Sequence, residues 1–282
     1  MKPLFFLVLL TAFIACKPVP VVPSTSTDYL PYTTTSDSAL HYFARGWEQI
    51  MDEGRYGPSE ATYRKALSFD PDFLIGKATL GRLTLDTTER NRIERELTGN
   101  HAELPEDERE LLELYTNFVR FTNLREHSPA AAMDMLKKVL PGGEETLGKL
   151  ILKYPAEVYL KCEYVELINS NHGPQAALDS LAVLTAERHA DNHFMMGFQA
   201  SLEAELGRHE KALGIAHRLA SIITDKTEPK PWAVYAEVYL AMDSFKLAKE
   251  YADKAVFLDP RNLDASRLQT RINRAIEKGS GK

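Results

Sequence analysis

Cysteine is scarce in this chain of 282 residues, which contains only Cys16 and Cys162. Two cysteines exclude a disulfide-rich scaffold and a four-cysteine zinc site. Positive charge is also in short supply, because 34 Lys and Arg stand against 40 Asp and Glu, for a formal net charge of −6 at pH 7. Such a chain lacks the basic excess that neutralises phosphates, so we expect no nucleic-acid partner. The 44% of hydrophobic residues is enough for a folded core.

Long apolar runs are missing as well. The run from Leu4 to Ala15 follows Lys2 and is shorter than the ~20 residues that a helix needs to cross a bilayer. Its positive start, apolar middle and small last residue are typical of a secretory signal peptide. We therefore expect a signal peptide over residues 1–15.

The end of this run, Phe13-Ile14-Ala15-Cys16, resembles the lipobox of bacterial lipoproteins, although Phe13 stands where Leu is usual. The resemblance implies that Cys16 is lipidated. The alternative is an ordinary signal peptide with a chance cysteine. Residues 16–36 are rich in Pro, Ser and Thr, which predicts a solvated tether. No acidic run follows Cys16, so the expected location is the bacterial cell envelope, with the lipid anchor in the outer membrane on its periplasmic face.

From residue 37 onward, apolar residues recur every three or four positions, which predicts an all-α fold. A regular pattern of large, small and aromatic positions is clearest in residues 231–262, at Trp232, Ala236, Tyr239, Ala248, Ala252, Ala255 and Pro260. A second copy in residues 40–72 uses Phe43, Ile50, Ser59, Tyr63, Ala66 and Pro71, with Trp47 at the small position. Small residues let two antiparallel helices approach closely, and the proline stops the second helix.

This pattern resembles the tetratricopeptide repeat (TPR). The resemblance implies a right-handed α-α superhelix over residues 37–282, with about six helix pairs and a C-terminal capping helix. It is weak between about residues 87 and 190, where Pro141-Gly142-Gly143 interrupts the helical pattern. The expected capping helix, from residue 262, carries Arg267 and Arg271 on its outer, solvated side. Members of the family mainly bind other proteins, so the resemblance also implies a protein or peptide partner.

In the TPR family the first helix of each pair lines a concave groove. The positions that would face it here are His41, Glu48, Met51, Asp52, Arg82, Leu85, Asp86, Phe194, Ser201, Glu205, Glu237 and Leu240. This mixture of acidic and apolar side chains suits a partner helix or an extended segment with some basic character. The alternative is that insertions around 87–104 or 140–152 fill part of the groove.

Motifs of catalysis are absent: the sequence contains no G-x-S-x-G, P-loop, G-x-G-x-x-G or H-E-x-x-H. We therefore expect no enzyme, no catalytic residues and no cofactor. His189 and His193 are four residues apart, but the residues between them are typical of a turn, so no metal site is expected. Cys162 has large apolar neighbours and is predicted to be a buried packing thiol.

The predicted function is a non-enzymatic, lipid-anchored scaffold or adaptor in a bacterial envelope, which contacts the membrane only through its lipid. The alternative is a helical lipoprotein that binds a glycan or another small ligand in nutrient uptake.

Overall fold

The computed structural model describes residues 28–186 and 188–280, and this part of the chain is all-helical, as predicted, with no strand. The predicted signal peptide and Cys16 lie outside the described residues. The helices are α1 (Asp37–Trp47), the π-helical turn η1 (Glu48–Asp52), α2 (Tyr56–Phe69), α3 (Leu74–Leu83), α4 (Thr87–Leu97), α5 (Glu106–His127), α6 (Pro129–Lys153), α7 (Val158–His172), α8 (Pro174–Leu184), α9 (His193–Glu205), α10 (His209–Ile222), α11 (Lys230–Ala241), α12 (Phe245–Leu258) and α13 (Leu263–Ser280).

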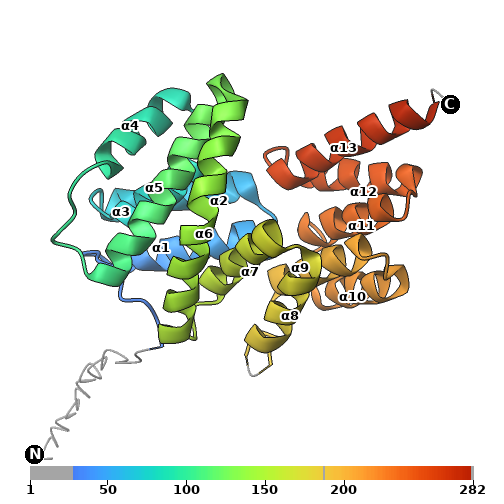
Figure 1. Ribbon diagram of the computed structural model, residues 1–282, viewed down its shortest axis with the longest axis horizontal. Coiled ribbons are helices and arrows are strands. Elements are labelled where there is room, and N and C mark those ends of the chain that lie inside the picture. The colour runs from blue at the N-terminus through green and yellow to red at the C-terminus, as the bar shows by residue number, and fades with distance from the viewer. Residues whose placement is uncertain (1–27, 187, 281–282) are drawn as a thin grey trace, which may run out of the picture.

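Consecutive helices pack as pairs along the chain (Figure 1). The pairs are α1 with α2, α3 with α4, α5 with α6, α7 with α8, α9 with α10, and α11 with α12, and α13 packs on the last pair. Successive pairs also touch through their first helices where α3 meets α5 and where α9 meets α11. This arrangement is compatible with an α-solenoid, in which each pair buries its apolar face against its neighbours.

Small residues bring the helices of a pair together. Ala236 on α11 and Ala248, Ala252 and Ala255 on α12 are fully buried at the positions where the sequence pattern requires small side chains. A larger side chain at any of them would push two close-packed backbones apart. The pattern therefore identified the packing residues of the last pair correctly.

The segment Pro141-Gly142-Gly143 does not break a helix, contrary to expectation, because α6 runs through it. Pro141 and Gly142 lie on the exposed side, where water can satisfy the carbonyl that a proline leaves without its helical partner. Gly143 is buried, and a Cβ there would lie 2.8 Å from the Leu114 side chain and 3.1 Å from that of Leu167. Packing of α6 between α5 and α7 thus overrides the local helix-breaking signal.

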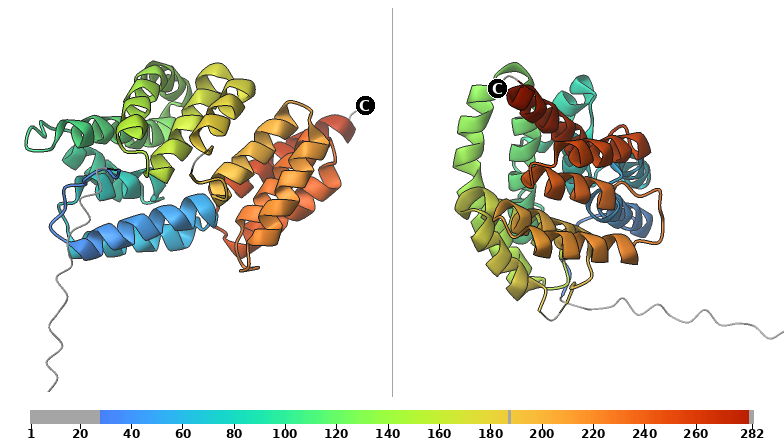
Figure 2. Two further views of the ribbon diagram at one scale, coloured as in Figure 1. Left: turned by 90° about the horizontal axis from the view of Figure 1, so that it is seen from below. Right: turned by 90° about the vertical axis from the view of Figure 1, so that its right-hand side faces the viewer.

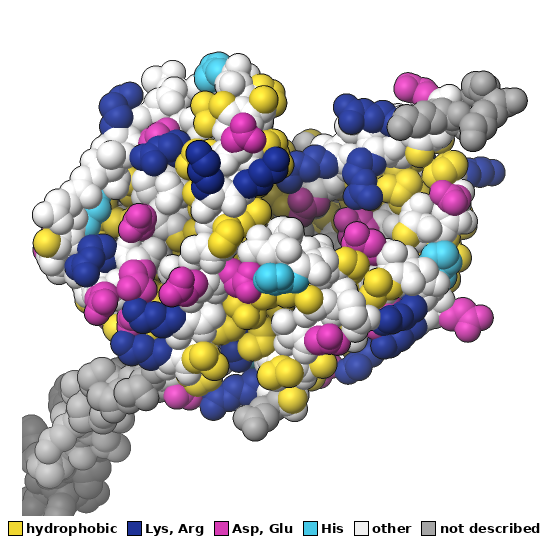
Figure 3. Space-filling view, in the orientation of Figure 1, with side chains coloured by type: hydrophobic (Ala, Val, Ile, Leu, Met, Phe, Trp, Pro, Cys, Tyr) yellow, Lys and Arg dark blue, Asp and Glu magenta, His cyan; other side chains and the backbone are white. Residues whose placement is uncertain are grey.

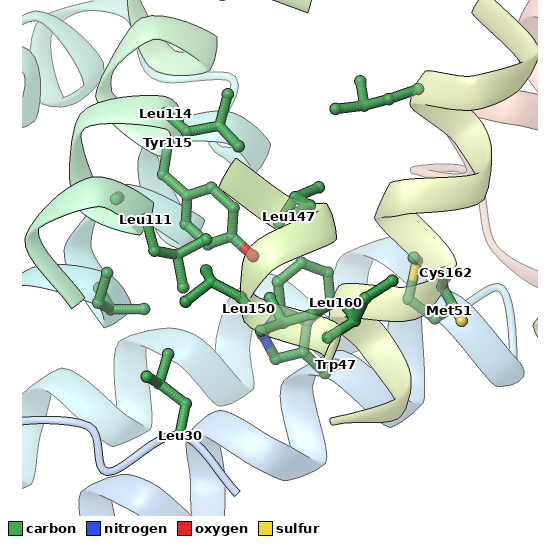
Figure 4. Close-up of a cluster of buried hydrophobic side chains, with 14 of the residues drawn as sticks. Leu30, Trp47, Met51, Leu111, Leu114, Tyr115, Leu147, Leu150, Leu160 and Cys162 are labelled. Atoms are coloured by element: carbon green, nitrogen blue, oxygen red, sulfur yellow. The ribbon is translucent and has the colours of Figure 1, made fainter. Parts of the chain in front are cut away.

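The predicted tether is wrong for residues 28–36, which lie against the folded body. The Tyr32 ring contacts those of Phe43 and Phe73, with centroids 5.2 and 6.3 Å away. The backbone N–H of Thr33 donates to Glu108 Oε2 at 2.9 Å. Leu30 is buried in the main core, and Figure 4 shows it below the core side chains that α5 and α6 contribute, such as Leu111 and Leu150. Burial of two large side chains outweighs the loop-forming character of the Ser/Thr tract around them.

A buried carboxyl holds this segment and makes stability depend on pH. Leu30 N–H donates to Glu157 Oε1 at 3.0 Å, and burial raises the pKa of Glu157 from 4.5 to about 7. Between pH 4.5 and about 7, the folded protein therefore keeps a proton on Glu157 that the unfolded chain has already lost. The contribution of Glu157 to the free energy of unfolding should fall by roughly 2–3 kcal/mol as the pH rises from 5 to 8.

Urea unfolding of the wild type and Glu157→Gln at both pH values measures this effect. Gln keeps an oxygen for the Leu30 N–H but carries no proton equilibrium, so the stability of that variant should depend less steeply on pH than that of the wild type, while other carboxyls with raised pKa values, such as Glu166, keep their share. Glu210→Gln, at an exposed position of α10, should follow the wild type. Equal slopes for Glu157→Gln and the wild type would contradict the assignment.

The two ends of the helical array touch each other. Asp259, after α12, accepts hydrogen bonds from the backbone N–H groups of Tyr56 and Gly57 at the start of α2. Asn262 Nδ2 donates to the Gly54 carbonyl at 2.7 Å, and Lys230 N–H donates to the Glu53 carbonyl at 3.0 Å. We call these four bonds the closure contact. In the left view of Figure 2 the end of the blue first helices reaches the orange C-terminal helices.

Candidate functional site

A central hollow lies between the N-terminal and C-terminal helices and consists of two adjoining cavities of about 330 and 640 Å³. Both are lined by Glu166, Phe194, Lys230 and Asp264, so the two cavities lie side by side. The lining comes mostly from the first helices of the pairs, α1, α3, α5, α7, α9 and α11, and from α13. Figure 3 shows its opening as a depression between the two upper parts of the molecule, with basic side chains on both sides.

Aromatic rings and one arginine form the floor of the smaller cavity. Arg82 on α3 lies over the rings of Tyr115 and Phe118, with its guanidinium carbon 4.7 and 5.0 Å from the centroids. Its Nη2 pairs with Glu163 Oε1 at 2.5 Å, and Glu163 also accepts a hydrogen bond from the Tyr115 hydroxyl. The Glu163 side chain is almost fully buried, so this ion pair is shielded from water. Trp47, also in the lining, belongs to the core cluster in Figure 4.

Carboxyl groups in the hollow hold their protons unusually well. Burial and the nearby Asp264 raise the pKa of Glu166 to about 8, although its side chain opens onto the cavity. Burial likewise raises the pKa of Glu237, to which the Ser201 hydroxyl donates a hydrogen bond. Glu237 is half-buried and Glu166 is exposed, so water still reaches both carboxyl groups.

The mouth of the smaller cavity is basic. Arg125 near the end of α5 and Arg267 on α13 both line it. The pKa of Arg125 is lowered first by burial and second by the nearby positive charge of Arg267. Lys230 lies deeper, with its ammonium 5.0 Å from the Phe194 ring centroid. Basic groups from α5, α11 and α13 thus converge on one opening.

Seven of the twelve predicted groove residues line the hollow, namely Met51, Arg82, Phe194, Ser201, Glu205, Glu237 and Leu240. The other five lie outside the two cavities, namely His41, Glu48, Asp52, Leu85 and Asp86. All of the predicted residues on α9 and α11 are among these seven.

The five outlying residues have local roles or face solvent. Asp52 accepts hydrogen bonds from the Tyr159 hydroxyl at 2.9 Å and the Phe194 N–H at 3.0 Å, joining η1 to α7 and α9. Asp86 caps α4 by accepting from the Glu89 N–H at 3.0 Å. Leu85 is 57% exposed in the loop before α4.

His41 and Glu48 complete this group. Both are exposed on the first helix and its extension, where the His41 ring contacts Tyr42 and Glu48 pairs with Arg45 at 2.8 Å.

Sequence reasoning missed the basic mouth. Arg125 belongs to α5, where the repeat pattern is weakest, and no local signal marks its orientation. Arg267 and Arg271 were expected on the outer side of the last helix, but both line the hollow. Both side chains are solvent-exposed, as expected, but α13 packs on α11 as well as on α12, which places them at the edge of the hollow.

The two insertions do not fill the hollow. No residue of 87–104 or of 140–152 lines either cavity. Residues 87–97 form α4, which packs on α3 and α5, and residues 140–152 belong to α6. The space in the described part of the chain is therefore open to a ligand.

Other sites for chemistry are not apparent in the described residues. Cys162 is fully buried, and burial raises its thiol pKa, which opposes thiolate formation. No group of three or more His, Cys, Asp or Glu in the described ranges is placed to hold a metal ion. No helix in those ranges combines the length and apolar character of a membrane span.

Comparison with known proteins gives no relative. The chain matches no family model and no curated protein sequence.

Proposed function

We propose that this chain is a non-enzymatic TPR-like scaffold of a bacterial envelope, anchored by lipid on Cys16, which holds an extended segment of a partner protein in its central hollow. The fold proposed with it is a right-handed superhelix of six helix pairs and the capping helix α13. The observation that carries the proposal is the lining of the hollow by the first helices of successive pairs. A solenoid presents its concave surface in this way, and such surfaces receive extended chains.

The shape and chemistry of the hollow support a peptide ligand. Its lining combines apolar rings with charged groups of both signs, spread over helices from α1 to α13. Backbone and side-chain groups of an extended segment can contact many such points in succession. A compact enzyme site, in contrast, requires convergent reactive groups.

A small ligand such as a glycan is the second candidate. The cavity volumes, about 330 and 640 Å³, lie in the range of small-molecule pockets, and rings such as Phe194 and Phe198 could stack on a sugar. The same experiment separates the two candidates.

Photo-crosslinking in the bacterium that makes the protein tests the proposal. A photoreactive phenylalanine replaces Phe121 or Leu240 in the hollow, or Phe257, which is 83% exposed on α12, as the matched outer position. Discrete protein adducts are expected from the two inner positions and none from the outer one.

Adducts from position 257 alone, or no protein adduct from either inner position, would contradict the peptide proposal. A glycan adduct from the inner positions would favour the second candidate. Fractionation of the same cells with Cys16→Ser tests the anchor, since that variant should leave the membrane fraction. A Cys16→Ser chain that stays with the membrane contradicts lipidation.

A further inference from the structure

We propose that the mouth of the hollow is an anion site, and that the segment held there is an acidic peptide with apolar side chains beside its carboxylates. This inference rests on the proposed function and deepens it. It also replaces the expectation of a basic partner segment, which came from the acidic residues among the predicted groove positions.

Three arginines that line the smaller cavity have N–H groups that could still donate hydrogen bonds. Arg82 Nη1 is buried and has no hydrogen-bond partner. Arg125 makes no ion pair within 4.0 Å among the described residues. Arg267 has only a long contact, 3.8 Å, to Asp264 in the same part of the chain. Arg82 and Arg125 are half-buried and Arg267 is exposed. Guanidinium groups bind carboxylate or phosphate oxygens well, because these match their geometry.

The acids of the cavity do not supply the missing partners. Glu163 already binds Arg82 Nη2 and the Tyr115 hydroxyl. Asp264 accepts a hydrogen bond from the Tyr56 hydroxyl. Glu166 is solvent-exposed and forms no ion pair with these arginines among the described residues. Arg125 and Arg267 therefore remain without a close ionic partner at the mouth.

Repulsion between the basic groups makes an added anion favourable. Arg125 and Arg267 come from α5 and α13, which lie far apart in the chain, and the charge of Arg267 destabilises that of Arg125. An anion placed between them would pair with both and join the two walls of the hollow. Figure 3 shows further basic side chains on both rims, which would steer an acidic segment inward.

Apolar side chains beside the arginines define the rest of the ligand. Phe118, Phe121 and Leu136 line the cavity from α5 and α6, and Leu263 lines it from α13. A ligand that carried only charged groups would leave this apolar surface exposed to water. A segment in which acidic and apolar residues alternate satisfies both parts of the site.

Calorimetric titration of the full chain with three capped hexapeptides tests the inference. Their sequences alternate Leu with Glu, Gln or Lys. The Glu peptide should bind at least tenfold more tightly than the Gln peptide, and the Lys peptide should be weakest. Binding of the Glu peptide should weaken as salt rises.

The variant Arg125→Gln/Arg267→Gln should weaken the Glu peptide by at least tenfold. Its matched control, Arg218→Gln/Arg274→Gln, removes the same charge from two exposed sites outside the cavities and should change affinity less than twofold. Circular dichroism checks folding. Arg125→Gln alone serves if the double variant unfolds, because the Arg125 guanidinium makes no hydrogen bond or ion pair among the described residues. It should still weaken the Glu peptide at least threefold.

The outcomes separate this inference from the proposed function. Tighter binding of the Lys peptide would overturn the anion site but leave a peptide-binding hollow. Equal losses in the two double variants would overturn it too, because only net charge would matter. No binding of any peptide at 1 mM would count against both.

Discussion

Asp259→Ala is expected to lower the free energy of unfolding by about 3 kcal/mol and to open the hollow. Asp259 is 5% exposed and accepts hydrogen bonds from the N–H groups of Tyr56 and Gly57. No side chain of the preceding residues caps α2, so Asp259 acts as its cap from 200 residues further along the chain. Its removal leaves buried donors unsatisfied, which costs more than a single bond contributes. Urea unfolding measures the loss, and small-angle scattering should show a larger radius of gyration.

Two further variants show whether the lost acceptor is responsible. Asp259→Asn keeps an oxygen that can accept from α2 and should lose no more than about 1 kcal/mol. Asp253→Ala removes an exposed carboxylate on α12 that pairs with Lys249, and should be close to neutral. If Asp259→Ala is as stable as Asp253→Ala, the closure contact does not hold the two ends together.

Gly46→Ala should destabilise the protein by about 2–3 kcal/mol although it adds only one methyl group. A Cβ at Gly46 would lie 2.6 Å from the Tyr63 ring, which is fully buried and cannot move aside. The added atom must therefore push α1 and α2 apart. The Ser59 hydroxyl, which donates to the Gly46 carbonyl at 2.8 Å, would be displaced as well.

Gly142→Ala is the matched control for this change. Gly142 is also helical, but a Cβ there meets nothing within 4 Å. The substitution should stabilise the protein by about 0.5–1 kcal/mol through the helix propensity of alanine. Thermal unfolding of the two variants should thus shift in opposite directions. A shift of the same sign in both variants would show that the contact with Tyr63 is not what determines the effect of Gly46→Ala.

The sequence predicted the parts of the fold that depend on local spacing. Ala248, Ala252 and Ala255 are buried where the repeat pattern places them, because the period of a helix fixes which residues face its partner. Ser201, Glu205 and Glu237 were assigned to the groove by the same argument, and all three line the hollow. Helical periodicity gave the face of these residues, whereas His41, Glu48 and Asp52 in the first pair lie outside both cavities.

Other features could not be predicted because they depend on distant partners. Tyr32 lies in a Ser/Thr-rich tract, and only the surfaces of Phe43 and Phe73 explain its packing. Pro141 remains helical because α6 packs on two other helices. Arg125 and Arg267 are 142 positions apart in the numbering, and no pattern in either segment points to the other. Such contacts arise from the curvature of the whole array.

The closure contact also has a consequence for how the chain folds. In an open array, any pair of helices can form first and recruit its neighbours, and the ends fray independently. Here the bond from Gly57 to Asp259 joins residues 202 positions apart, so a large loop must close before the first and last pairs stabilise each other. The N–H groups at the start of α2 have no side-chain acceptor until Asp259 has left the ribosome. We therefore expect the two ends to unfold as one cooperative unit. Amide protons of the helix pairs between them should exchange more slowly than they would in an array whose ends fray independently.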